Sequence, residues 1–479
     1  MLATLVPPLL LLPLASGPAA VDFNRDPCNV LFNFSHLPQC DTGLSARERS
    51  AALAAAMTTG QKISFVGGGY QTSMPTLGIP LVQWSDGIFM SISNNWLGAA
   101  QTQNLSKWAP FPTVLPGPMT MAASFDLDLV ARAATMVSDE ARSLNNDMSP
   151  HYGLVGTIVM NTCRDPRWGR CQEGYGECPF LSAEMVRTYI RGIQGPPDAK
   201  YLKIATDSKH LAVHTGPESP NNARRENRLG FDSVVSQRAI YEHFLPPFRA
   251  AAEAGTSSFM CSCACDHHHH QQQLLRLSLS FPGLTPVCWV CRTHADNAIN
   301  GVPSCANPWL LTSIARDFWN RSDMTIQSDC GTLTYMTDDH HFTDSGAEAA
   351  ADFFNAGGNT VCGGVGTGAA ISSGLLSEAV LTERVTEALV PMFRLGAFDS
   401  PGDVEWKDLS KYNKSVVGTP AHTAIAREAA QKGVVLLENR NQTLPLKPSE
   451  WVGKTILVTG PHSGNETEYP GGFCFGDSR

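Results

Sequence analysis

The feature that most constrains the fold is a long alternation of strand-like and helix-like segments. Apolar runs typical of β-strands occur at 78–84, 153–161, 202–210, 256–262 and 323–329. Segments with helical spacing follow them, at 126–145, 181–195, 236–255, 307–320 and 346–358. Parallel strands need crossover connections, usually helices, so this alternation predicts an α/β fold with a parallel sheet. A (β/α)8 TIM-type barrel is the natural large solution, and its chemistry gathers at the C-terminal ends of the strands.

The chain of 479 residues is long enough for two domains. A helix beginning near Leu44 and ending near Gly60 opens the first domain, which we place at 21–400. The polar, turn-rich stretch 401–420 predicts a linker. A helix and a strand, "KTILVTGP" at 454–461, follow within 421–479. That stretch looks like the start of an α/β sandwich domain too short to bury its own core, so we expect a polypeptide incomplete relative to a two-domain ancestor.

The first twenty residues have the features of a signal peptide. An apolar run is followed by small residues, with a cleavage site expected near Ala20. No other stretch is long and apolar enough to span a membrane. We therefore expect a secreted, soluble mature protein. Glycosylation sequons agree collectively with this expectation, and they lie at Asn33, Asn104, Asn320, Asn413, Asn441 and Asn465.

The 14 cysteines also fit an oxidising compartment. Cys28 and Cys40 could close a small N-terminal loop, whereas three further cysteines share the loop-like segment 163–178. Cys261 and Cys305 are a tempting pair, because removing residues 263–295 would bring them close in sequence. Sequence alone leaves the connectivity open.

Residues 263–295 break the pattern, since they carry homopolymer His and Gln tracts. We favour a flexible inserted loop for this low-complexity stretch. A zinc site is the alternative, because the segment offers thiols and an imidazole. Its candidate ligands are Cys263, Cys265, Cys288, Cys291 and His294.

The net charge indicates which kinds of partner the protein can bind. The net charge is −9, and Lys and Arg form no block. Nucleic acid is therefore not expected as a partner. A neutral or weakly polar substrate is compatible with this composition.

The segment "MTIQSDCGTL", 324–333, places a carboxylate at the end of a predicted strand. Asp329 stands there beside a cysteine and a glycine. Asp is common in turns and helix caps, which is one explanation. The other is a catalytic carboxylate at the C-terminal mouth of a barrel strand.

Several longer motifs occur in one order along the chain. They are "LGIPLVQWSDG", "RDPRWGR", "KHLAVHTGPE", "FDSVVSQRAIYEHFLPPF", "NGVPSCANPWLLT", "SDCGTLTYM" and "AREAAQKGVVLLENRNQTLPL". This series resembles glycoside hydrolase family 3, most closely its secreted β-xylosidase and β-glucosidase branches. The resemblance covers most of 45–465, apart from 263–295. It implies a (β/α)8 barrel followed by a second α/β domain.

The resemblance implies an exo-acting, retaining β-glycosidase that uses neither metal nor organic cofactor. A retaining enzyme needs a carboxylate to attack the anomeric carbon and an acid to protonate the departing oxygen. The resemblance gives the first role to Asp329. The family's acid/base is usually a Glu in the second domain, which we expect to lie beyond Arg479. The expected substrate is an oligosaccharide or an aryl glycoside, with the choice of xylose or glucose open.

The same resemblance implies substrate contacts. Asp86 would accept hydrogen bonds from the terminal sugar, although the closest branches usually carry Glu there. Arg170 would donate its fork to a hydroxyl, and Lys209 and His210 would serve adjacent hydroxyls. Met260 is either an apolar wall of the pocket or a core residue.

Two acidic residues of the "RDPRWGR" segment, Glu173 and Glu177, are expected to form ion pairs within the loop. A second function remains open. A chain without its acid/base would be a carbohydrate-binding derivative of the same fold, catalytically impaired.

Overall fold

The computed structural model describes residues 26–32, 34–68, 73–82, 84–85, 112–147, 154–196, 198–216, 231–262, 297–363, 366–457 and 459. Several predicted features lie outside these residues. They are the signal peptide at 1–20, the sugar contact Asp86, the sequons at Asn33, Asn104 and Asn465, and the 263–295 segment with its candidate zinc ligands.

A parallel sheet of five strands forms the centre of the molecule, in the order β1-β2-β3-β5-β8. The strands are β1 (Trp84–Ser85), β2 (Val155–Val159), β3 (Ala205–Leu211), β5 (Ser258–Cys261) and β8 (Thr325–Ser328). The prediction of strands at 153–161, 202–210, 256–262 and 323–329 is confirmed. In the predicted run 78–84 only Trp84 joins the sheet. β2, β3, β5 and β8 are buried along their whole length, as strands covered on both faces must be.

The α/β prediction is confirmed, but the described residues form no closed ring of eight strands. A parallel bridge between Gln327 and Thr360 extends the sheet beyond β8. Three short strands, β4 (Asp232–Ser233), β6 (Ala298–Ile299) and β7 (Val302–Pro303), make a separate sheet. They pair with one another and therefore do not enlarge the central ladder.

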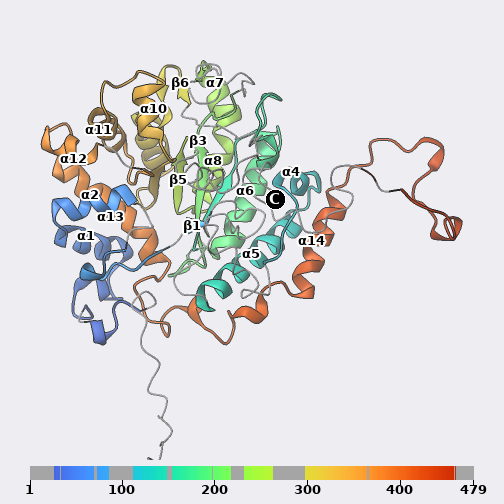
Figure 1. The fold of residues 1–479 in the computed structure, drawn as a ribbon, viewed down its shortest axis with the longest axis horizontal. Helices are drawn as coiled ribbons and strands as arrows, with labels where there is room; N and C mark the ends of the chain where they lie inside the picture. The colour runs from blue at the N-terminus through green and yellow to red at the C-terminus, as the bar shows by residue number, and fades with distance from the viewer. Residues whose placement is uncertain are drawn as a thin grey trace, which may run out of the picture.

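Helices cover both sides of the sheet (Figure 1). On one side lie α5 (Leu127–Asp147), α6 (Pro179–Gln194) and α14 (Pro420–Lys432). On the other lie α1 (Ala46–Ala56), α2 (Thr59–Gly68), α11 (Gly346–Ala356), α12 (Thr367–Ser372) and α13 (Glu378–Arg394). Shorter helices are α4 (Pro118–Ala123), α7 (Gln237–Ala239), α8 (Pro246–Glu253) and α10 (Thr332–Asp338). The helices predicted at 126–145, 181–195 and 346–358 are confirmed.

Two predicted helices differ in detail. The segment 236–255 is divided into α7, a π-helical turn at Ile240–Phe244, and α8. Pro246 begins α8, where a residue without an N–H costs no helical hydrogen bond. The segment predicted at 307–320 is π-helical over Trp309–Phe318.

The helix expected to end near Gly60 is two helices. α1 ends at Ala56 and α2 begins at Thr59, so Gly60 lies in the first turn of the second helix. Thr58 and Gln61 exchange hydrogen bonds between side chain and backbone, with distances of 2.8 and 3.3 Å. This reciprocal cap starts α2 and explains the break.

The core between sheet and helices is built around aromatic side chains. Phe259 of β5 packs between Phe248 of α8 and Trp319, with ring centroids 6.1 and 5.8 Å apart. Successive side chains of a strand point to opposite faces. Met260 is therefore turned away from this aromatic layer, toward the inner face of the sheet.

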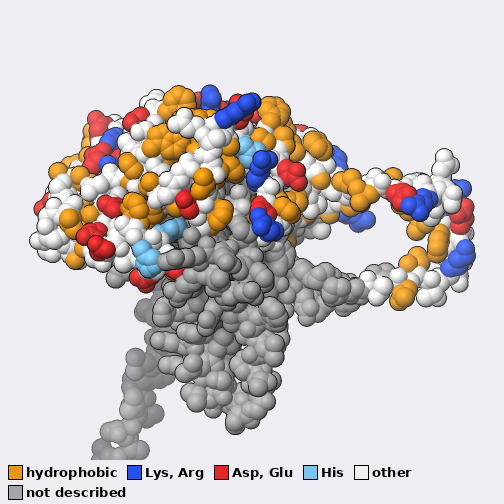
Figure 2. Space-filling model, turned by 90° about the horizontal axis from the view of Figure 1, so that it is seen from above, with side chains coloured by type: hydrophobic (Ala, Val, Ile, Leu, Met, Phe, Trp, Pro, Cys, Tyr) orange, Lys and Arg blue, Asp and Glu red, His pale blue; other side chains and the backbone are white. Residues whose placement is uncertain are grey.

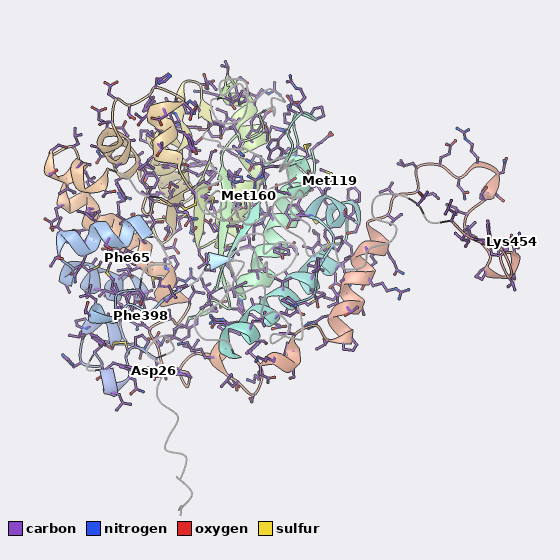
Figure 3. The ribbon with its side chains drawn as sticks, viewed as in Figure 1. Asp26, Phe65, Met119, Met160, Phe398 and Lys454 are labelled. Carbon is purple, nitrogen blue, oxygen red and sulfur yellow. A yellow bond between two sulfur atoms is a disulfide. The ribbon has the colours of Figure 1, made fainter. Side chains whose placement is uncertain are left out.

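The chain after α14 projects away from the body (Figure 1). α14 itself is tied to α5 by Arg132, whose guanidinium donates to both carboxylate oxygens of Glu428 at 3.0 Å. Beyond it, Val434, Leu437 and Leu457 are 77%, 91% and 83% exposed. Apolar side chains on this projection stand open to solvent (Figure 2), and Figure 3 labels Lys454 within it.

The strand predicted at 454–461 is not formed over its described residues, 454–457. An extended segment becomes a strand only when another strand accepts and donates its backbone hydrogen bonds. The projecting segment has no such neighbour among the described residues. The sandwich-domain prediction for 421–479 therefore stays a prediction.

Four disulfides are formed among the described cysteines. The expected pairs Cys28–Cys40 and Cys261–Cys305 are confirmed. Cys163 pairs with Cys171, whereas Cys178 is exposed and pairs with no described cysteine. The fourth bond, Cys330–Cys362, joins the segment after β8 to the segment after Thr360, and sequence spacing did not predict it.

Candidate active site

The site is assembled at one edge of the sheet, because all five strands run in the same direction and end there. The residues just after β2 reach Asn161, β3 carries His210 near its end, and β8 is followed by Asp329. Met160, the neighbour of Asn161, lies in the middle of the body (Figure 3).

His210 occupies an irregularity in the ladder between β3 and β5. Lys209 pairs with Met260 and Leu211 pairs with Cys261, so the register of the ladder shifts at His210. Such a bulge re-aims a side chain. Here the displaced backbone is satisfied by Asn161, whose Nδ2 donates to the His210 carbonyl at 2.9 Å and whose Oδ1 accepts from the His210 N–H at 2.8 Å.

Asp329 directly follows β8 and is only 6% exposed. Its N–H donates to the Cys261 carbonyl at 3.3 Å, and its Oδ1 accepts from the Cys330 N–H at 2.6 Å. Its Oδ2 lies 3.5 Å from Nε2 of His210. The Cys330–Cys362 disulfide and the bond from Gly331 N–H to the Cys362 carbonyl, 3.1 Å, attach this turn to the next segment.

Arg170 reaches the same place from the loop that follows β2. Its Nη1 is 3.2 Å from Nε2 of His210. Its Nε and Nη2 donate to the two carboxylate oxygens of Glu173 at 2.8 and 2.6 Å, and both side chains are 6% exposed. A two-pronged pair of this kind fixes the guanidinium plane. The structure therefore joins Glu173, Arg170, His210 and Asp329 in one buried chain of contacts.

Lys209 and Met260 lie next to one another in register on β3 and β5, and both are nearly fully buried. On the inner face, Asp207 accepts from Ser258 Oγ and, at 3.0 Å, from Nε2 of Gln327. Strand alternation puts Asp207 and Lys209 on the same face. Met260 is thus beside a polar, charged inner row and apart from the aromatic core, which agrees better with a pocket wall than with a core residue.

The structure brings together most of the residues predicted for the active site. Asp329, His210 and Arg170 are brought together, with Lys209 and Met260 on the adjoining strands; Asp86 lies outside the described residues. The ion pair expected for Glu173 is present. The one expected for Glu177 is not found, because that side chain is exposed and makes no ion pair with another described residue.

Sequence reasoning overlooked several neighbours of the site. Asn161 is the first residue of the "NTCRDPRWGR" segment and directly follows a predicted strand. The same position at a strand end was the reason for selecting Asp329. His214 follows His210 by four residues, and the two rings are 4.6 Å apart. Trp168, within "RDPRWGR", is buried with its ring edge-on to His214 at 6.3 Å.

A further histidine borders this loop. Nε2 of His243 lies 3.0 Å from Thr162 Oγ1, in the segment that leads from Asn161 to Arg170. Burial, and secondly the positive charge of Arg164, hold the pKa of His243 below its ordinary value of 6.5. His243 is therefore protonated less readily than an exposed histidine.

Within the described residues, no group of three or more His, Cys, Asp or Glu side chains is arranged to hold a metal ion. Nor does any helix in this part of the chain have the length and apolarity needed to cross a membrane. The described side chains of the site are a carboxylate, an imidazole, a guanidinium and an amine, from Asp329, His210, Arg170 and Lys209.

Comparison with known proteins agrees with the α/β fold. Residues 104–361 match the Glycosyl hydrolase family 3 N terminal domain. The probable exo-1,4-beta-xylosidase bxlB of Aspergillus terreus is 32% identical over 443 residues, covering 91% of this chain and 51% of the relative. The beta-xylosidase/alpha-L-arabinofuranosidase 1 of Medicago sativa subsp. varia is 32% identical over 441 residues, covering 90% and 50%.

A solved structure is similar as well. The GH3 exo-beta-xylosidase XlnD, in complex with a xylobiose aziridine activity-based probe, superposes with a TM-score of 0.71 at 29% identity, covering 86% of this chain and 48% of that one. A β-glucosidase from Erythrobacter marinus, at 23% identity and a TM-score of 0.64, shares the fold.

The central parallel sheet with helices on both sides is an α/β fold of the TIM-barrel type. The chain belongs to glycosyl hydrolase family 3. It spans about half the length of the curated relatives that it matches.

Proposed function

We propose that this chain carries the nucleophile half of an exo-acting, retaining β-glycosidase that removes terminal β-D-xylosyl residues from oligosaccharides. The observation that carries the proposal is the position of Asp329: a buried carboxylate at the C-terminal end of a parallel strand, in contact with His210 and through it with Arg170. Xylose is favoured over glucose because the curated relatives described above are named as xylosidases.

The proposed reaction has two steps. A carboxylate oxygen of Asp329 attacks C1 of the terminal sugar, and the bond from C1 to the aglycone oxygen breaks. The aglycone takes up a proton from a general acid as it leaves. None of the described residues is assigned this role. Water then attacks C1 of the glycosyl-enzyme and gives a proton to the conjugate base of that acid, while the bond from C1 to Asp329 breaks and frees the sugar and the carboxylate.

The remaining site residues bind and orient the sugar. Arg170, held in one plane by Glu173, offers donors to hydroxyls, as does the ammonium of Lys209. The thioether of Met260 supplies an apolar surface next to them. Asp86 is proposed as a further acceptor of hydroxyl hydrogen bonds.

Trapping tests the nucleophile directly. A 2-fluoro xyloside with an activated leaving group should label the protein once, and peptide mapping should place the sugar on Asp329. Asp329→Asn should abolish labelling and hydrolysis. Asp323→Asn is the matched control, since Asp323 lies before the same strand, pairs with Arg321 and is 45% exposed; it should label normally.

Two other outcomes would change the conclusion. Labelling elsewhere, or full activity of Asp329→Asn, would refute the nucleophile assignment. Binding of xylose or glucose without labelling would instead indicate a carbohydrate-binding derivative of the fold.

Leaving groups supply a second measurement. General acid catalysis contributes about 10²–10⁴-fold, and an activated aryl xyloside needs little of it. We expect these 479 residues to hydrolyse an aryl xyloside far better than xylobiose. Equal efficiency on both would contradict this expectation, and faster hydrolysis of the aryl glucoside would reassign the sugar.

We also propose that the protein acts outside the cell. The four disulfides support an oxidising compartment. Two sequon asparagines, Asn320 and Asn441, are exposed and therefore accessible to glycosylation. Recovery of the glycosylated protein from culture medium would test this.

A further inference from the structure

We propose that Asn161 is a positioning residue that, together with Arg170, keeps His210 neutral with its proton on Nδ1. The consequence for catalysis rests on the function proposed above. The protonation state itself follows from hydrogen bonds alone and can be measured without turnover.

The orientation of the Asn161 amide is determined by His210. One backbone group of His210 is a donor and the other an acceptor, and Asn161 meets both, at 2.8 and 2.9 Å. A flipped amide would place an N–H against an N–H and an oxygen against an oxygen. Oδ1 of Asn161 is therefore the atom that faces the His210 N–H, and it acts as an acceptor.

The same oxygen lies 3.4 Å from Nδ1 of the His210 ring. An acceptor at that position favours a proton on Nδ1. On the other side of the ring, Nε2 faces Nη1 of Arg170 at 3.2 Å. A guanidinium has donors only, so Nε2 must offer its lone pair. Together the two contacts select the neutral imidazole protonated at Nδ1.

This state matters for Asp329. With Nε2 occupied as an acceptor, the ring donates no proton to Asp329 across their 3.5 Å contact. An imidazole protonated at Nε2 would donate to that carboxylate and weaken it as a nucleophile. Asn161 also bonds both backbone groups of His210 at the register shift, so one side chain supports both the bulge and the tautomer.

Among the described residues, the charged and titratable groups facing the ring include Arg170, Asp329 and the ring of His214 at 4.6 Å. Lys209 precedes His210 in the chain. Arg170 opposes protonation of the ring and Asp329 favours it. Asn161→Asp would place a carboxylate next to Nδ1, in addition to that of Asp329 next to Nε2. It would also remove the amide N–H that donates to the His210 carbonyl.

The experiment uses protein labelled with ¹⁵N only at histidine. The His210 signals are identified by their absence from His210→Gln. The wild-type protein should show a protonated Nδ1 and an unprotonated Nε2 at neutral pH. In Asn161→Asp the titration of the ring should move upward by about one pH unit or more, the size typical of an opposite charge in contact.

Activity on an aryl xyloside gives the second readout. The acid limb of kcat/KM should move upward in Asn161→Asp together with the ring titration. Asn146→Ala is the matched control, because Asn146 is also buried and bridges backbone, donating to the carbonyls of Trp406 and Tyr412 at 3.0 and 3.1 Å. That variant should leave both the tautomer and the pH profile unchanged.

A proton on Nε2 of His210 in the wild-type protein would overturn the proposal, whether or not the variant folds. So would an unchanged ring titration in folded Asn161→Asp. If the ring behaves as expected while no glycoside is hydrolysed, the assignment of Asn161 stands and the proposed function fails.

Discussion

The buried ion pair between Arg170 and Glu173 allows a sharp test of how the site is held. Glu173→Gln keeps the shape of the side chain and removes its charge. Both partners are 6% exposed, and two hydrogen bonds of 2.8 and 2.6 Å join them. Removing one partner of such a pair leaves the other charge buried and uncompensated, which costs about 3–5 kcal/mol.

The free energy of unfolding should therefore fall by that amount, measured as a lower urea midpoint at unchanged m-value. Glu242→Gln is the control. Its pair with Arg238 is 83% and 63% exposed, and an exposed pair contributes about 0–1 kcal/mol. Catalytic efficiency should also fall in Glu173→Gln, because Arg170 loses the partner that orients its fork.

A double-mutant cycle separates this pair from its surroundings. Arg170→Met alone should also lower the free energy of unfolding by several kcal/mol, because it leaves the buried carboxylate of Glu173 without its cationic partner. The double variant should be much less destabilised than the sum of the two single ones. Strict additivity, or an equal effect of Glu173→Gln and Glu242→Gln, would refute the reasoning.

The remaining predictions concern stability. Replacing Cys261 and Cys305 by alanine opens a loop of 44 residues, for which chain entropy gives a loss of about 4 kcal/mol, measurable in the same urea titration. Phe353→Ala empties a fully buried site and should cost about 3–5 kcal/mol, seen as a lower urea midpoint. Because the pKa of His243 is lowered in the folded protein, the unfolded chain takes up a proton at a higher pH than the folded protein does. The stability contributed by neutral His243 is thus complete above pH 6.5 and is lost as the pH falls through the folded value, whereas His243→Gln should flatten this part of the stability profile.

Much of the scaffold was predictable, because strand and helix patterns are local. The strands around 155–159, 205–211, 258–261 and 325–328 follow from short apolar runs, and each is buried as the parallel arrangement requires. The position of Asp329 at a strand end also follows from reading along the chain. Local reading missed the cap at Thr58, since helical composition continues across the break between α1 and α2.

Residue chemistry, the succession of strands and helices along the chain, and the place of the carboxylate at a strand end were thus determined by the sequence itself. The tertiary structure alone decided which groups meet: Asn161 with His210, 49 residues apart, and Cys330 with Cys362, 32 residues apart. It also decided that residues 454–457 form no strand, because a strand depends on a neighbour that a local pattern cannot supply. Contacts of this kind depend on how parallel strands stack side by side, and that geometry is not written in the spacing of any one segment.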